Sequence, residues 1–202
     1  MIPRTCFVIS SIALAAGALA TGAPGWTGDK EFRPGTANEY AHQSADRVIV
    51  GAKQFNTEDL TAEAFGKKAD LLRYGVLPVL VVIQNNRDKA LDLRELEVNL
   101  VGVDGRHVNA VDPQDIPFLW KHGRKPPAVT LPVPLPKKGN PLNAPQIVTR
   151  AFAAKLVPPN DSVSGFFYFE AQSEPGDKLY LNGLRDARSG QDILYFEFAL
   201  ER

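Results

Sequence analysis

The chain has 202 residues, of which 44% are hydrophobic and 23% are charged, and its 23 basic and 23 acidic residues give a formal net charge of zero. These proportions exclude a wholly disordered chain, which needs a larger net charge, and a polytopic membrane protein, which needs several apolar runs of about 20 residues. They also disfavour a generally basic nucleic-acid-binding protein, so we expect no nucleic-acid partner.

The amino terminus has the features of a secretory signal peptide over residues 1–20. Arg4 precedes an uncharged, apolar stretch from Cys6 to Ala20, which ends in the small-x-small pattern that signal peptidase accepts. About 15 apolar residues are too few for the alternative, a membrane anchor. We therefore predict cleavage near Ala20, export to the periplasm or the extracellular space, and no transmembrane segment in the mature chain.

Cleavage also removes Cys6, the only cysteine. We then expect no disulfide, no thiolate nucleophile and no cysteine metal ligand in the mature protein. Cys6 stands before the apolar stretch rather than at the cleavage point, so we do not expect it to carry a lipid. About 180 residues suffice to bury a core without cross-links.

Two regions follow the leader. Residues 21–45 are polar and interrupted by glycine and proline, which predicts a flexible arm. From residue 46 the apolar residues recur at strand spacing, and we predict a folded domain over 46–202. Its first strand is expected at 47–55.

A short helix is expected next. Asn56 can cap it, Glu58 and Asp59 suit the positive end of the helix dipole, and Gly66 can end it.

The strongest strand signal is 76–83, which is apolar on both faces and must therefore be covered on both sides. Pro78 cannot donate to a strand ladder, so pairing on that side should begin after it. Residues 96–100 alternate between apolar and polar, as in a strand with one solvated face. Asp104-Gly105 then predicts a hairpin with a type I′ turn.

Aromatic strands are expected at 166–171 and 193–200, with a further strand at 179–181 between them. The second has Tyr195 and Glu197 on the face opposite Phe196. About seven short strands predict an all-β fold, an antiparallel immunoglobulin-like β-sandwich with one short helix and a long Pro-rich crossing. A closed barrel is the alternative.

Two segments resemble a known family. Residues 79–86 and 96–100, with the Asp104-Gly105 hairpin, look like the first half of the secreted bacterial immunoglobulin-like domains of telokin-like topology. Residues 158–170 are similar to the later turn and aromatic strand of that family, except that Pro159 stands where the family pattern has glycine. The resemblance implies a sandwich fold and an exported location. Because the family is largely uncharacterised and not known for catalysis, it implies no activity.

The proline-rich middle of the chain is also its basic part. Residues 116–160 hold ten of the 16 prolines and seven basic residues but no acidic residue, so this segment has a charge of +7 and the remainder −7. Proline alternation at 132–136 favours extended backbone, and we predict a surface crossing over 123–146.

This segment supplies the candidate binding residues, which combine one aromatic ring with five cations: Trp120, Lys121, Arg124, Lys125, Lys137 and Lys138. In one interpretation they bind an acidic surface, such as anionic polysaccharide, with Trp120 as an anchor. In the other, the cations pair with the protein's own carboxylates and Trp120 is a core residue.

Signals for catalysis are weak. His42, His107 and His122 do not have metal-ligand spacing, and phosphate-binding loops are absent from the sequence, so we predict no metal and no cofactor.

Three carboxylates, Asp186, Asp192 and Glu197, could serve glycoside cleavage if they converged in a cleft. Their positions beside a turn and on the solvated face of a strand favour plain surface residues instead.

The leading hypothesis is an exported, non-enzymatic domain that binds or scaffolds at the cell envelope, with an envelope protein or anionic polysaccharide as its partner. One alternative is a ligand-binding module for anionic or carbohydrate material that uses the basic segment and Trp120. The other is an envelope hydrolase with an unrecognised carboxylate site.

Overall fold

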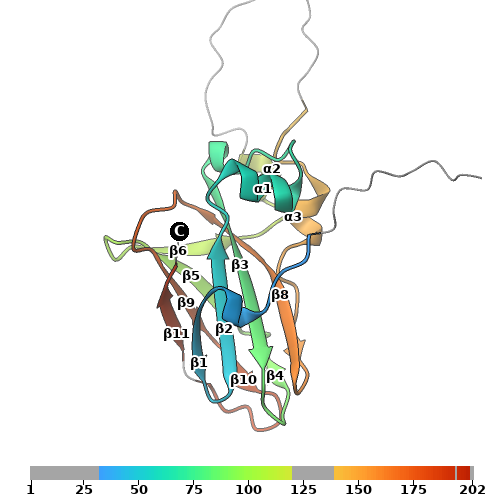
Figure 1. Cartoon of the computed structure of the whole chain (residues 1–202), viewed down its shortest axis with the longest axis vertical. Helices are drawn as coiled ribbons and strands as arrows, with labels where there is room; N and C mark the ends of the chain where they lie inside the picture. The colour runs from blue at the N-terminus through green and yellow to red at the C-terminus, as the bar shows by residue number, and fades with distance from the viewer. Residues whose placement is uncertain (1–31, 120–138, 194, 201–202) are drawn as a thin grey trace, which may run out of the picture.

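A computed structural model of the chain describes residues 32–119, 139–193 and 195–200 (Figure 1). In these ranges the main structure is an eight-stranded antiparallel sheet. Its strands, in spatial order, are β1 (Ala41–Ala45), β2 (Val48–Gln54), β3 (Val76–Asn85), β8 (Asp161–Glu170), β6 (His107–Val111), β5 (Glu97–Val101), β9 (Lys178–Asn182) and β11 (Phe196–Ala199). A small sheet follows the order β10 (Arg185–Asp186), β4 (Leu91–Asp92) and β7 (Leu156–Val157).

The helices of the described ranges are all short. They are η1 (Ala37–Glu39), α1 (Glu58–Phe65), η2 (Leu72–Tyr74), α2 (Ile116–Leu119) and α3 (Pro145–Thr149). Helices α1, α2 and α3 gather at one end of the large sheet, opposite the end that carries β4 and β10 (Figure 1).

The large sheet curls into a nearly closed barrel. Its two outer strands, β1 and β11, lie beside each other, and the backbone N–H of Glu197 donates to Gln43 Oε1 at 2.8 Å across the seam. The predicted immunoglobulin-like sandwich is therefore wrong, and so is the sandwich implied by the family resemblance. Period-two alternation marks a buried and a solvated face equally well in both folds, so it does not decide whether strands divide into two sheets or curl into one.

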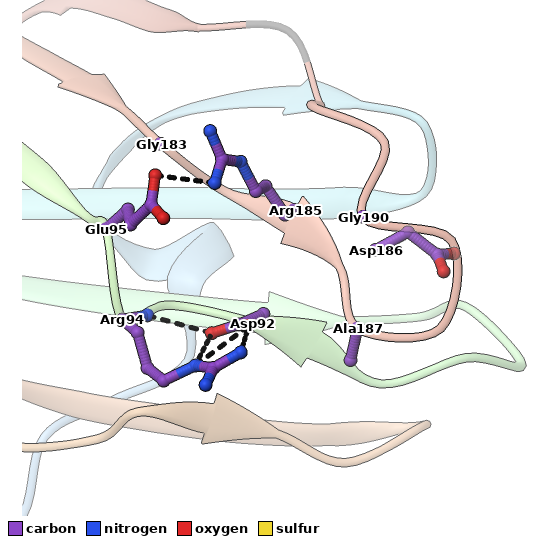
Figure 2. A pocket seen from close by; sticks show the side chains of 8 residues that line it. All are labelled: Asp92, Arg94, Glu95, Gly183, Arg185, Asp186, Ala187 and Gly190. Carbon is purple, nitrogen blue, oxygen red and sulfur yellow. Dashed lines mark hydrogen bonds and ion pairs between the residues drawn. The ribbon is translucent and has the colours of Figure 1, made fainter.

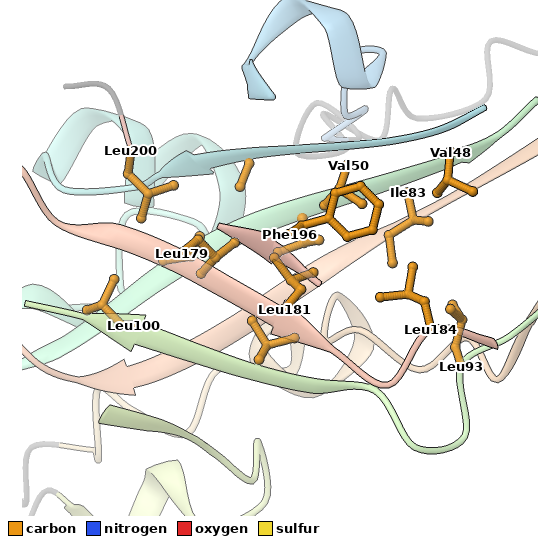
Figure 3. Close-up of a cluster of buried hydrophobic side chains, with 14 of the residues drawn as sticks. Val48, Val50, Ile83, Leu93, Leu100, Leu179, Leu181, Leu184, Phe196 and Leu200 are labelled. Carbon is orange, nitrogen blue, oxygen red and sulfur yellow. The ribbon is translucent and has the colours of Figure 1, made fainter. Parts of the chain in front are cut away.

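Strand β3 is buried on both faces, as predicted, but two different structures cover it. Leu77, Val79, Val81 and Ile83 point into the barrel, where they join a cluster that includes Leu179, Leu181 and Phe196 (Figure 3). Val76, Leu80 and Val82 point outward and pack under the helical end, against a cluster that includes Phe65, Ile147 and Phe166. Helices and loops therefore cover the outer face of β3, as a second sheet would in a sandwich.

The prediction for Pro78 is confirmed. The ladder between β3 and β2 begins at the Val79 and Gln54 pair, immediately after the proline, whereas the ladder between β3 and β8 includes Pro78. The Pro78 carbonyl accepts from Phe55 N at 2.9 Å, so its missing N–H also faces the β2 side.

Helix α1 and the hairpin were predicted at the right places with errors of detail. Thr57, rather than Asn56, caps α1 by accepting from Leu60 N at 3.3 Å. The hairpin joins β5 to β6, but a type I′ turn needs positive φ at both central residues, and of the two only Gly105 has it, at 77°. Gly102 N donates to Arg106 O at 2.9 Å, which closes a three-residue loop with glycine in the left-handed position.

The folded domain begins before residue 46. Strand β1 lies within the range expected to be a flexible arm, and Ala37 is fully buried, so the folded domain includes residues 37–45. The predicted crossing is described only from residue 139 onward, where Leu142 is buried in the core beneath the helices and Pro145 begins α3. This part of the crossing is packed rather than extended over the surface.

Candidate functional site

The candidate binding residues from the basic segment, Trp120, Lys121, Arg124, Lys125, Lys137 and Lys138, lie outside the described residues. Two other cations of the +7 segment are described. Arg150 donates to the carbonyl of Ala64 in α1, and its guanidinium carbon lies 5.4 Å from the centroid of the Phe32 ring. This one charge of the segment is therefore used inside the protein, while Lys155 is exposed.

A pocket of about 170 Å³ is formed by residues in and around β4 and β10 (Figure 2). These strands lie at the end of the barrel opposite the helices (Figure 1). Strands β4 and β10 position the pocket, together with the loop after β4 and the segments on both sides of β10. Its lining is mostly charged or glycine: Asp92, Arg94, Glu95, Gly183, Arg185, Asp186, Ala187 and Gly190.

Two arginines of this pocket, Arg94 and Arg185, bind two of its carboxylates, Asp92 and Glu95 (Figure 2). Arg94 Nε lies 3.0 Å from both carboxylate oxygens of Asp92. Arg185 bridges two acids, Glu95 and Asp192, each at 2.5 Å. The side-chain hydrogen bond from Arg94, aided by its backbone N–H, lowers the pKa of Asp92 to about 2.

Asp186 is buried, contrary to the prediction that it is a solvated surface residue. Its carboxylate accepts from Arg87 Nη2 at 2.9 Å and from the backbone N–H groups of Arg188 at 3.0 Å and Ser189 at 2.9 Å. The backbone hydrogen bond from Ser189 is the largest of the effects that hold its pKa at about 2. Arg87 also reaches Asp46 at 3.3 Å, so it connects the β1–β2 turn, the β3–β4 loop and β10.

Sequence inspection missed Arg87, because it stands in a polar turn with five other hydrophilic residues and nothing in the local pattern marks it as buried. The three candidate carboxylates do not share one partner. Asp186 is paired with Arg87, Asp192 with Arg185, and Glu197 with Lys178 Nζ at 2.9 Å. Each of the three carboxylates is therefore paired with a different basic residue.

A neighbouring pocket of about 290 Å³ lies between the β3–β4 loop and the loop after β10. It is lined by Asp88, Lys89, Ala90, Pro159, Ala187 and Arg188. Within the described part of the chain, no group of three or more His, Cys, Asp and Glu side chains could hold a metal ion. Of the helices in the same ranges, none is both long and apolar enough to cross a membrane.

Comparisons with solved structures give similarities, two of which are described below. No protein-family model matches the chain, and neither does any curated protein. The chain is similar to a Bacillus subtilis structure described as "a putative lipoprotein (ycdA)", with a TM-score of 0.40, 14% identity and coverage of 81% of this chain and 39% of that one. It therefore spans about two fifths of that protein. It is also similar to the structural genomics target SoR45, with a TM-score of 0.33, 12% identity and coverage of 78% and 90%.

Proposed function

We propose that this protein is an exported, non-enzymatic domain that binds or scaffolds at the cell envelope. The apolar leader over residues 1–20 supports export. The observation that carries the non-enzymatic part is the pairing of charges in the pocket, where Asp92 binds Arg94 and Asp186 binds Arg87.

Acid–base catalysis by carboxylates needs one group that stays protonated near neutral pH, which requires a raised pKa. The pKa values of Asp92 and Asp186 are instead lowered to about 2. Such groups are ionised throughout the physiological range and are poor proton donors. The pairing of Asp186 supports a structural role, because Arg87 also binds Asp46 in the β1–β2 turn and so joins the small sheet to the barrel.

The test is cell fractionation of the tagged full chain in a bacterial host, followed by crosslinking and capture of partners from the envelope fraction. We expect a processed form about 20 residues shorter in the exported fraction. The control lacks residues 2–20 and should stay in the cytoplasm. Full-length, unprocessed protein in the cytoplasm contradicts export, and hydrolysis of envelope glycan that is lost in Asp92→Asn or Asp186→Asn contradicts the non-enzymatic proposal.

The charge of +7 over residues 116–160 favours a second candidate, a module for anionic polysaccharide. Such binding is strongest at low ionic strength, where screening is weakest. We expect Lys137→Gln with Lys138→Gln to weaken retention on an anionic polysaccharide. The matched control is Lys67→Gln with Lys68→Gln, an adjacent and exposed lysine pair outside the segment. Equal loss in both variants, or no retention of the unaltered protein at low salt, contradicts this candidate.

A further inference from the structure

The outer face of β11, β9, β5 and β6 carries an unusual set of side chains. Strand alternation turns Leu179, Leu181 and Phe196 into the barrel, so their neighbours point outward. One transverse row across the four strands is set by pairing: Glu197 with Tyr180, Tyr180 with Asn99, and Asn99 with Asn109. Strands lie about 4.8 Å apart, so this row is about 14 Å long.

Aromatic rings form the centre of this face. The Tyr180 and Tyr195 rings have their centroids 5.6 Å apart and their planes inclined by 31°. His107 lies on the other side of Tyr180, with its ring centroid 6.3 Å away and nearly perpendicular to it. Tyr195 is 54% exposed, so its large ring lies in solvent on the outer face of the barrel.

Polar groups that can both donate and accept hydrogen bonds surround these rings. Asn99 and Asn109 share the row of Tyr180, and Asn182 pairs with Glu97 one row away. A side-chain amide offers two donors and one acceptor, which matches adjacent hydroxyl groups.

The charges of this face almost cancel. Lys178 and Glu197 form an ion pair at 2.9 Å, which leaves Glu97 as the remaining outward carboxylate of these paired strands. A face with this balance repels a polyanion slightly and offers a polycation little attraction. Charge complementarity therefore points to an uncharged ligand.

We propose that this face, named here the tyrosine face and defined by Tyr180, Tyr195, His107, Asn99 and Asn109, binds a neutral pyranose glycan. A pyranose presents C–H groups on its ring face and hydroxyl groups at its edge. The C–H groups suit the electron-rich faces of the tyrosine rings. The hydroxyl groups suit the flanking amides. The inference deepens the proposed envelope function by naming a class of partner, and it rests on that function for the source of the glycan.

The test is titration of the purified protein with chitohexaose and with cellohexaose, followed by NMR chemical shifts and calorimetry. We expect binding that weakens at least about tenfold in Tyr180→Ala with Tyr195→Ala. Tyr180→Phe with Tyr195→Phe keeps both rings and should retain binding within about threefold. The matched control is Phe118→Ala, which removes a ring that is 62% exposed at the helical end and should leave binding unchanged.

Thermal unfolding of each variant separates loss of binding from loss of fold, and the Phe variants keep the test valid if the Ala variant unfolds. The proposal is overturned if neither sugar binds at millimolar concentration. It is also overturned if only hyaluronate or spermine binds, or if Phe118→Ala weakens binding as much as the tyrosine variant. If envelope partners are still captured although neither sugar binds, this inference is rejected and the proposed function stands.

Discussion

Two glycines of the charged pocket differ in how closely the surrounding backbone approaches them. Gly183 and Gly190 both have left-handed backbone, with φ of 83° and 68°. A Cβ at Gly183 would clash with the backbone carbonyl of Glu95, whereas a Cβ at Gly190 would meet open space. The Gly183 backbone therefore lies directly against the loop that carries Arg94 and Glu95.

We predict that Gly183→Ala destabilises the protein clearly more than Gly190→Ala. The left-handed conformation costs about 1–2 kcal/mol in either variant, and the clash adds to this cost only at Gly183. Urea unfolding of the two variants and the unaltered protein measures the difference. Equal losses would mean that the loop bearing Glu95 moves aside freely.

The paired carboxylates predict the response to acid. The folded pKa values of Asp92 and Asp186 are about 2, below the ordinary value of 3.8. A group whose pKa is lowered on folding contributes stability above its unfolded value and loses it as the pH falls toward its folded value. The free energy of unfolding should therefore be steady from pH 7 to 5 and should fall between about pH 4 and 2.

Urea unfolding of Asp186→Asn as a function of pH tests this. The variant should be less stable at pH 7 and should lose less on acidification than the unaltered protein. The control is Asp88→Asn, which removes an exposed carboxylate that lies 3.4 Å from Arg47. A variant that keeps the full acid loss would show that Asp186 is not its source.

At the scale of elements, a side chain bridges the seam of the barrel within the described residues. Gln43 in β1 accepts from Glu197 N in β11, in place of a backbone ladder between these strands. We predict that Gln43→Ala costs about 1 kcal/mol and speeds amide exchange at Glu197, because this N–H loses its acceptor. Ser44→Ala, on the other face of β1, is the control. Unchanged exchange at Glu197 would show that the seam is held by packing.

Local signals predicted individual elements better than their assembly. Pro78 predicted where a ladder begins, and Gly66 predicted where α1 ends, because backbone chemistry acts on immediate neighbours. The sandwich was wrong because closure depends on β1 meeting β11, more than 140 residues apart in sequence. Nothing in either strand specifies that partner.

In the candidate sites too, the sequence predicted the placement of residues within an element but not the contacts between distant elements. The sequence placed Tyr195 and Glu197 on the face of the last strand that is opposite Phe196, but only the pairing of β9 with β11 brings Tyr180 beside Tyr195. Likewise, Asp186 stands in a stretch of polar residues, and its burial depends on Arg87, 99 positions away. Contacts at such separation have no periodic signal in the chain.

For the molecule as a whole, Arg150 connects the basic segment to the folded domain. It binds the Ala64 carbonyl and lies over Phe32, so it joins α3, α1 and the amino-terminal segment. We predict that Arg150→Ala destabilises the protein by about 1.5–3 kcal/mol, as expected for a lost charged hydrogen bond. Lys155→Ala removes an exposed cation of the same segment and should change stability by less than about 0.5 kcal/mol.

Thermal unfolding of both variants measures this. A similar small effect in the two would show that the segment's charge is not used to hold the fold. A large effect only at Arg150 would show that at least one cation of the basic segment stabilises the fold through contacts within the protein.

Because β8 lies between β3 and β6, the barrel cannot close before β8 has been synthesised. Strand β3 ends at Asn85, and its partner β8 begins at Asp161, 76 positions later. At about 5–20 residues per second, a ribosome needs about 4–15 s to produce this interval. Until then β3, which is apolar on both faces, has an open edge of the kind that pairs with other chains. Until β8 has been made, this edge of the growing chain is therefore a place where it can pair with another chain and aggregate.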